Sequence, residues 1–194
     1  KIRRTTMDKY FTSPEGKAIY PYLTHPDTEF KTDGEYHTKL ECNLEDSKPL
    51  IHKIKSVIAE QIKLQHNDNP NKAIKKAPLP YKEVGDKIIF NFKLSAKGTR
   101  KDDGKPFTQK PQIVDAKKRP MEDQQIWGDS ILKIICEPYG WNMPIGIGCT
   151  LRLKVVQVVK LVTGKPQNDI LSGLTEVEQQ PTEVREDQQQ GVNL

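Results

Sequence analysis

Strict alternation of apolar and polar residues in one stretch of the chain sets the first limit on its fold. In KIIFNFKLSAKG, residues 87–98, every second position is apolar: Ile88, Phe90, Phe92, Leu94 and Ala96. A period of two is typical of a β-strand that buries one face, because successive side chains of a strand point to opposite sides. The sequence therefore predicts a half-buried strand whose polar face carries Lys93 and Lys97.

Further segments show the same period, and one segment shows a helical period. Alternation recurs in residues 34–44, where the inward set is Tyr36, Thr38, Leu40, Cys42 and Leu44. SILKIICEP (130–138) and TLRLKVVQVVKLV (150–162) are rich in β-branched residues and predict two more strands. Between the first two strands, isoleucines at helical spacing predict a helix over about 48–66, with Ser47 as its N-cap and Pro49 in its first turn.

Strands with one helix between the early and the later ones predict a mainly β fold, a small and mostly antiparallel barrel. The prolines at 70, 78 and 80 predict that residues 67–86 form a loop. The 194 residues suffice for one domain of ordinary size, or at most two small ones. We predict a basic arm over 1–10, the barrel domain over 11–165 and a disordered, acidic and Gln-rich tail over 166–194.

Charge is unevenly distributed along the chain. The formal net charge is +5, and residues 166–194 hold six acidic residues and one basic residue, a net charge of −5. Residues 1–165 therefore carry +10, the difference between +5 and −5. A basic body with an acidic tail suggests a polyanionic partner, although solubility alone would also explain the charge.

The sequence holds no pattern typical of an enzyme, a metal site or a membrane protein. No stretch approaches the roughly 20 apolar residues of a membrane helix, and we expect no secretory signal in KIRRTTMDKY. Three cysteines without a close pair indicate free thiols in a reducing compartment. The four histidines lack metal-ligand spacing, and no phosphate-binding glycine loop or nucleophile elbow occurs. We expect no catalytic residue, cofactor or metal; a nuclease is the alternative among enzymes.

Basic residues gather between residues 87 and 119, where ten of them stand against three acids. Each strand lysine taken alone is equally typical of a solvated surface. Neutralising the phosphates of a nucleic acid, however, needs many cations along one groove. The candidates for nucleic-acid contact in this part and in the N-terminal arm are Lys93, Lys97, Lys105, Phe107, Lys110, Lys117, Lys118, Arg119, Arg3 and Arg4.

Two aromatic residues in CEPYGWNMPIGIG, residues 136–148, support the same prediction. Proline, glycine and asparagine favour a surface turn, which would hold Tyr139 and Trp141 at the rim of the barrel. Sequence-tolerant binding of single strands combines a positive groove with aromatic faces on which bases stack, each worth about 1–3 kcal/mol. In the alternative, both rings cap the open end of the barrel and are buried there. Trp127 is expected to pack in the core or at the rim, at the start of a strand.

Four segments, in this order and spacing, resemble the single-stranded DNA-binding protein of short-tailed podovirus phages. They are FTS (11–13), YKEVGDKIIFNFKLSA (81–96), VDAKKRPMED (114–123) and EPYGWNMPIGIG (137–148). The resemblance covers roughly residues 8–165. It implies an oligonucleotide-binding (OB) fold, a five-stranded Greek-key barrel with one packed helix, and it places Tyr139 and Trp141 beside the DNA groove.

The resemblance also implies a function and partners. The protein would coat single-stranded DNA without catalysis and with little sequence preference during phage DNA replication, recombination and repair, and would promote strand annealing. Its partners would be the phage DNA polymerase and helicase–primase, in the cytoplasm of the host cell, and the resemblance allows a homodimer. The residues for partner contact would be Glu183, Glu186, Asp187 and Leu194 in the tail.

The tail departs from the family pattern. In the family it is densely acidic and ends in an aromatic residue, whereas here it is Gln-rich, modestly acidic and ends in GVNL. Two alternatives stay open from the residues alone. An RNA-binding barrel is one, because base stacking does not read the 2′-hydroxyl group. The other is a basic protein-interaction or assembly module without preference for single strands.

Overall fold

The computed structural model describes residues 9–163, apart from residues 72, 101 and 122–123. The predicted basic arm lies almost wholly outside these residues, as does the predicted tail. The site predictions that fall outside them concern Arg3, Arg4, Glu183, Glu186, Asp187 and Leu194. The structure does not test the predicted roles of these residues.

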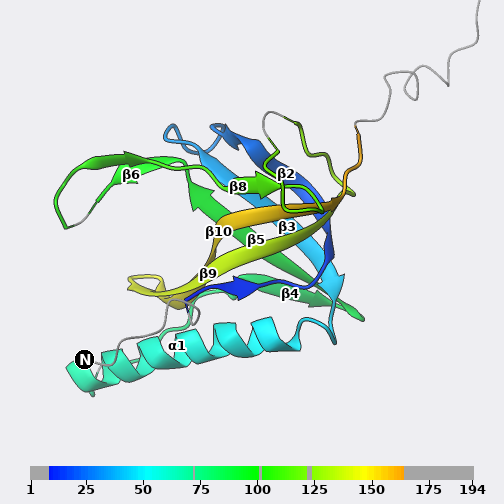
Figure 1. The fold of residues 1–194 in the computed structure, drawn as a ribbon. Coiled ribbons are helices and arrows are strands. Elements are labelled where there is room, and N and C mark those ends of the chain that lie inside the picture. The colour runs from blue at the N-terminus through cyan, green and yellow to red at the C-terminus, as the bar shows by residue number, and fades with distance from the viewer. Residues whose placement is uncertain (1–8, 72, 101, 122–123, 164–194) are drawn as a thin grey trace, which may run out of the picture. The chain divides into compact units, whose positions relative to one another are not determined.

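Five long strands in the described part of the chain form a closed barrel (Figure 1). They are β2 (Gly16–Asp27), β3 (Glu35–Asn43), β5 (Lys87–Ser95), β9 (Ile131–Met143) and β10 (Gly146–Lys160). The pairs β2–β3, β3–β5, β9–β10 and β2–β9 are antiparallel, and β5–β10 is parallel. Each strand thus has two neighbours in the cycle, which closes the sheet on itself. The predicted mainly β fold with a barrel is confirmed.

Short strands extend this barrel at several places. β1 (Phe11–Thr12) pairs with β9, β4 (Tyr81–Val84) with β5, and β8 (Gln112–Val114) runs parallel to β10. β6 (Lys97–Thr99) and β7 (Pro106–Thr108) form a hairpin that projects to the left in Figure 1. The predicted loop over 67–86 is wrong at its end, where β4 lies. The ring of Tyr81 packs edge-on against Phe90 with 5.9 Å between ring centroids, which anchors this edge strand.

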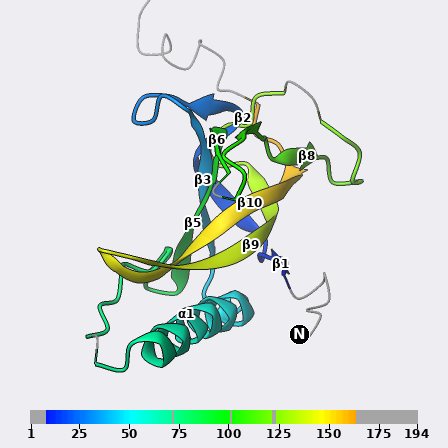
Figure 2. The ribbon, with the colours of Figure 1, turned by 90° about the vertical axis from the view of Figure 1, so that its left-hand side faces the viewer.

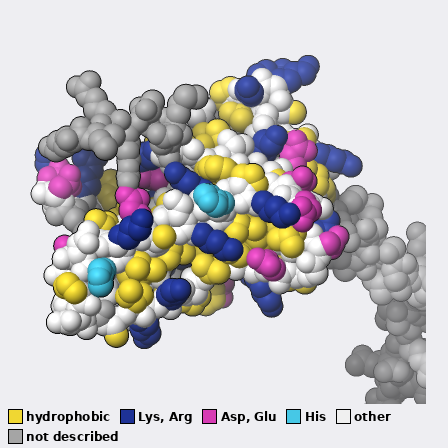
Figure 3. All heavy atoms as spheres, turned by 90° about the horizontal axis from the view of Figure 1, so that it is seen from below, with side chains coloured by type: hydrophobic (Ala, Val, Ile, Leu, Met, Phe, Trp, Pro, Cys, Tyr) yellow, Lys and Arg dark blue, Asp and Glu magenta, His cyan; other side chains and the backbone are white. Residues whose placement is uncertain are grey.

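Helix α1 (Lys48–Asp68) confirms the predicted helix and extends two residues beyond it. It lies below the barrel in Figures 1 and 2 and buries Leu50, Ile51 and Ile54. Its opposite side exposes basic and hydrophobic side chains intermixed, as the view from below shows (Figure 3). The predicted cap is wrong in its mechanism: the Ser47 hydroxyl makes no capping bond and donates to the carbonyl oxygen of Asn43 at 2.6 Å.

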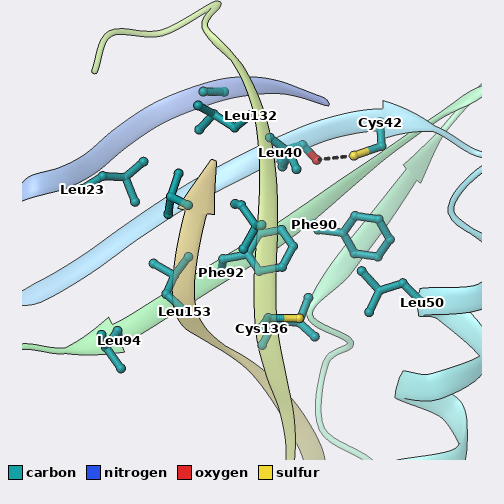
Figure 4. Close-up of a cluster of buried hydrophobic side chains, with 14 of the residues drawn as sticks. Leu23, Leu40, Cys42, Leu50, Phe90, Phe92, Leu94, Leu132, Cys136 and Leu153 are labelled. Atoms are coloured by element: carbon teal, nitrogen blue, oxygen red, sulfur yellow. Dashed lines mark hydrogen bonds between the residues drawn. The ribbon is translucent and has the colours of Figure 1, made fainter. Parts of the chain in front are cut away.

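The inward side chains of the strands fill the barrel. The predicted inward set of β5 is confirmed, and Ile88, Phe90 and Phe92 are fully buried. Figure 4 shows Phe90 and Phe92 facing residues of β3, β9 and α1, such as Leu40 and Leu50. The three cysteines are free and buried, and burial raises the pKa of each thiol to about 12. These thiols are therefore neutral core side chains.

No helix in the described residues has the length and apolar character needed to cross a membrane. Among the same residues, no three histidine, cysteine or acidic side chains are grouped so that they could hold a metal ion.

Candidate nucleic-acid interface

Tyr139 and Trp141 lie on a strand, which corrects the prediction of a turn. β9 continues through both residues to Met143 and pairs with β10 without interruption from Cys136 onward. The turn itself comprises only residues 144–145. Gly140, between the two rings, faces α1: a Cβ atom there would lie 2.7 Å from Cγ of Gln61. The glycine that suggested a turn instead allows the helix to approach the sheet closely.

The Trp141 indole lies against the backbone of the neighbouring strand. Its register partner on β10 is Gly148, where a Cβ atom would lie 2.4 Å from Cζ2 of the indole. The indole N–H also donates to Oγ1 of Thr150 at 2.9 Å. Only glycine leaves room for the ring in this position. The ring is thus half-buried and held in one orientation before any ligand arrives.

Tyr139 is exposed and carries a cation over its ring. Its side chain is 42% exposed, so the alternative in which both rings are buried at the barrel end is wrong. The guanidinium carbon of Arg152 lies 3.3 Å from the Tyr139 ring centroid, a cation–π contact. Arg152 belongs to the outward face of β10, on the same side of the sheet as Thr150.

Strand register extends this face across the barrel. On β10 and β5, Arg152 pairs with Lys93; Lys93 then pairs with His37 on β3, and His37 with Tyr22 on β2. The Tyr22 and His37 rings lie 4.9 Å apart between centroids. Trp141 and Tyr139 continue the same face on β9. We call this set the aromatic–basic row: Tyr22, His37, Lys93, Arg152, Tyr139 and Trp141.

Two acidic groups among the residues that the structure describes lie at the row, and both have partners: Asp27 contacts Nε2 of His37 at 3.1 Å, and Glu137 is the register partner of Arg152 on β9. The Glu137 carboxylate accepts contacts from the ammonium groups of Lys9 and Lys154, each at 3.2 Å. Burial alone would raise the pKa of Glu137, but the hydrogen bonds from Lys154 and Lys9 outweigh it and hold the pKa below its ordinary value. Among the described residues, neither Lys93 nor Arg152 has an ion pair with an acid. The row therefore presents cations that can meet an anion.

The other predicted cations lie on two projecting segments. Lys97, Lys105 and Phe107 belong to the β6–β7 hairpin, and Lys110 follows it. The hairpin and the β9–β10 turn extend from the same side of the barrel, to the left in Figure 1. Phe107 packs over Gly98 within the hairpin, where a Cβ atom would lie 2.9 Å from the ring.

The second segment is the turn after β8, which holds Lys117, Lys118 and Arg119. Asp115 organises it, accepting backbone N–H groups of Lys117 and Arg119 and the Arg119 side chain at 2.7 Å. These bonds, led by the backbone N–H of Arg119, hold the pKa of Asp115 below its ordinary value despite an opposing contribution from desolvation. Gln157 of β10 donates to the carbonyl oxygen of Ala116 at 3.1 Å and ties the turn to the barrel.

The structure thus brings together Tyr139, Trp141 and Lys93, while the hairpin and turn residues stand in separate groups. The sequence did not lead us to predict Arg152, His37 and Tyr22 as members of the aromatic–basic row. Alternation in TLRLK, which places Thr150 and Arg152 on one side of a strand, was a signal that could have found Arg152. No local pattern marks His37 or Tyr22, because their place in the row follows from strand pairing.

The fold of this chain matches solved structures of phage proteins. One is gp2.5, a single-stranded DNA-binding protein encoded by bacteriophage T7, with 26% identity and a TM-score of 0.68, covering 90% of this chain and 98% of that one. The chain folds like phage single-stranded DNA-binding proteins. The OB-fold barrel implied by the sequence resemblance is thereby confirmed.

A second match is the single-stranded DNA-binding protein from bacteriophage Enc34, with 18% identity, a TM-score of 0.53 and coverage of 87% of each chain. The same protein in complex with single-stranded DNA matches at 19% identity and a TM-score of 0.54, covering 82% of this chain and 89% of that one. No protein-family model matches the sequence, and a search of curated proteins finds no match.

The contact between Trp141 and Gly148 gives a first prediction. In a Trp127→Phe background, where Trp141 is the sole tryptophan, Gly148→Ala should lift the indole off the strand and expose it. Acrylamide quenching of its fluorescence should then increase. Thr150→Ser, which keeps the hydroxyl acceptor, serves as the control and should leave quenching unchanged. Equal quenching of the Gly148→Ala variant and its parent would show that the ring does not rest on Gly148.

Glu137 gives a prediction about pH. Because the pKa of Glu137 is depressed in the folded state, its stabilisation is present above its ordinary pKa of 4.5 and is lost as the pH falls through the depressed value. Glu137→Gln should therefore lower the free energy of unfolding at pH 7 by roughly 1 kcal/mol, and less at acid pH. Urea denaturation at several pH values measures this. Glu15→Gln, at a more exposed ion pair with Lys133, is the matched control. If Glu137→Gln lowers the free energy of unfolding by the same amount at every pH, the account is refuted.

Proposed function

We propose that this protein binds single-stranded DNA along the aromatic–basic row with little sequence preference. The observation that carries the proposal is the joint placement of Tyr139, Trp141, Arg152 and Lys93 on one outward face. Two aromatic rings offer surfaces for bases, and two cations beside them offer partners for phosphates. The fold likeness to phage single-stranded DNA-binding proteins supports the same function.

The geometry favours unpaired strands. Ring faces such as those of Tyr139 and Trp141 bind the flat face of a base, which in a duplex is covered by its neighbours in the stack. Arg152 lies over Tyr139 and pairs in register with Lys93, so a phosphate between two stacked bases would meet both cations. Stacking on a ring and contact with a phosphate do not depend on which base is present, which gives weak sequence preference.

The sequence resemblance supports a finer proposal. In it, the protein coats single strands during phage DNA replication, recombination and repair, promotes strand annealing, and supports the phage polymerase and helicase–primase from the host cytoplasm. The protein is not an enzyme in this proposal. An annealing assay with complementary oligonucleotides tests the annealing step, which should be faster with the protein than without it; an unchanged rate would refute that part alone.

The direct test uses two variants of the row. Tyr139→Ala should weaken binding to an oligo-dT strand by one stacking contribution, about 1–3 kcal/mol, or about 5- to 150-fold in Kd. Arg152→Ala should weaken binding too. It should also reduce the slope of log affinity against log salt by about 0.7 for each phosphate that the protein no longer neutralises. Fluorescence anisotropy with a labelled oligonucleotide at several salt concentrations measures both effects.

Lys55→Ala is the matched control for charge, because Lys55 is exposed on α1 away from the row. It should change the Kd by less than about twofold, since one remote exposed charge is largely screened by salt. The same titration with a duplex of equal length should give weaker binding. Equal affinity for single and double strands, or unaltered binding by both row variants, would contradict the proposal. Single-stranded RNA is included as a further ligand, because the row has no evident means of reading the 2′-hydroxyl.

A further inference from the structure

A second group of exposed aromatic side chains lies at the far end of the aromatic–basic row. Tyr20, Tyr22 and Trp127 are 73%, 43% and 50% exposed. They line a groove of about 540 Å³ between β2 and the segment that leads into β9, together with Ile19, His25 and Ile126. Trp127 was expected in the core or at the rim, at the start of a strand. Its half-exposure excludes the core, and it lies in a loop before β9 begins at Ile131.

Backbone geometry turns these rings outward. The pairing of β2 with β3 shifts register between Ile19 and Tyr22, as in a β-bulge, and such irregularities re-aim side chains. Within this break, Tyr20 has a φ of 49°, in the left-handed region that non-glycine residues rarely adopt. Asp129, on the other side of the groove, has a φ of 67°. A strained backbone that exposes a large aromatic ring is more typical of a binding site than of packing.

Polar atoms of these rings are also available. Within the described residues, the indole N–H of Trp127 has no hydrogen-bond partner, whereas that of Trp141 donates to Thr150. The Lys17 ammonium at the groove lies 3.6 Å from the Asp129 carboxylate, and the two side chains are 45% and 72% exposed. The groove thus combines ring faces, a free donor and a cation in reach of solvent.

We propose that this groove is a second base-stacking platform, which takes an unpaired nucleobase from the same DNA strand that occupies Tyr139 and Trp141. This inference rests on the proposed function. Tyr22 connects the two platforms, because it lines the groove and also packs against the His37 ring within the aromatic–basic row. The bound DNA strand would pass over Arg152, Lys93 and His37 between one platform and the other.

The span is compatible with one strand on one barrel. Along the row, four spacings between neighbouring strands separate β9 from β2, a path of roughly 19 Å over the sheet surface. The row meets β9 at Glu137, the register partner of Arg152, so the path to Tyr139 is two residues longer and the path to Trp141 four. Barrels of this kind cover about 4–16 nucleotides, so a strand at the long end of that range can engage both platforms. A strand of about 4 nucleotides has at most one base for each of Tyr139, Trp141, Tyr20 and Trp127 and none left for the row between them, so it cannot fill both platforms while it crosses the row.

The chain offers a direct test, because Trp127 and Trp141 are its two tryptophans. Trp127→Phe leaves Trp141 as the sole tryptophan, and Trp141→Phe leaves Trp127, with an aromatic ring retained in each case. Each variant is titrated with oligo-dT strands of about 4 and about 16 nucleotides. Trp141 should be quenched by both strands, and Trp127 strongly only by the longer one.

Tyr20→Ala provides a second measurement. It should weaken binding of the longer strand by at least about fivefold and leave binding of the short strand within about twofold. Phe30→Ala is the matched control, since Phe30 is 86% exposed and does not line the groove. It should leave both affinities unchanged, and circular dichroism should show that both variants keep the parent fold.

Two outcomes separate failure of the inference from failure of the proposed function. If saturating long strand quenches Trp141 but leaves Trp127 emission and the Tyr20→Ala affinity unchanged, the second platform is refuted and the proposed function stands. If neither tryptophan responds and no binding is detected, the proposed function itself fails. Quenching of Trp127 by the long strand, with the selective weakening in Tyr20→Ala, supports the platform.

Discussion

Closure of the barrel depends on a short parallel pairing between β5 and β10. The register partners are Leu151 with Phe92 and Arg152 with Lys93. Because side chains alternate along a strand, Leu151 and Phe92 are fully buried in the core while Arg152 and Lys93 point outward. A shift of one residue would bury the cations and expose the apolar pair, at a large free-energy cost. The core therefore fixes where the cations of the candidate interface lie.

This placement has an electrostatic consequence. Two side chains of like charge on adjacent strands destabilise a sheet, and the described residues provide no acid that pairs with either Lys93 or Arg152. The nearby Glu137 is occupied by Lys9 and Lys154. A phosphate group bound between the two side chains would reduce any repulsion between them.

The aromatic side of the interface is preorganised in a different way. Gly148 leaves space for the Trp141 ring, and Thr150 fixes its N–H group. Arg152 lies over one face of Tyr139. Side chains held in this manner lose little conformational entropy when a ligand binds. The strand backbone and its side chains thus hold both rings in place.

The periodicity of apolar residues correctly predicted individual strands and the helix. The inward residues of β5 and the extent of α1 followed from periods of two and 3.6 residues. Pro138 and Gly140 misled the prediction around Tyr139, because long-range pairing with β10 overrides local turn preference and Gly140 serves contact with α1. Trp127 was misplaced because a turn at Asp129, with positive φ, separates it from β9.

Three members of the aromatic–basic row, Arg152, His37 and Tyr22, were not predicted from the sequence, and neither was the way the six side chains line up. That arrangement requires the register of strands far apart in the chain, such as β5 with β10, which no local pattern encodes. The β6–β7 hairpin and the turn around Asp115 could be recognised in the sequence as basic segments. Their position relative to the two rings could not be predicted. The sequence could therefore predict the barrel and propose Tyr139, Trp141 and Lys93 as candidates, while the position of Arg152 over the Tyr139 ring came from the structure.

Photochemical cross-linking locates the bound strand most directly. A single-stranded DNA oligonucleotide that carries 5-iodo-2′-deoxyuridine is bound to the protein and irradiated. Trypsin then releases residues 134–152 as one peptide that holds both Tyr139 and Trp141. The account predicts that this peptide carries the main cross-link and that duplex competitor does not remove it. Cross-links confined to peptides of α1, with residues 134–152 unmodified, would contradict it.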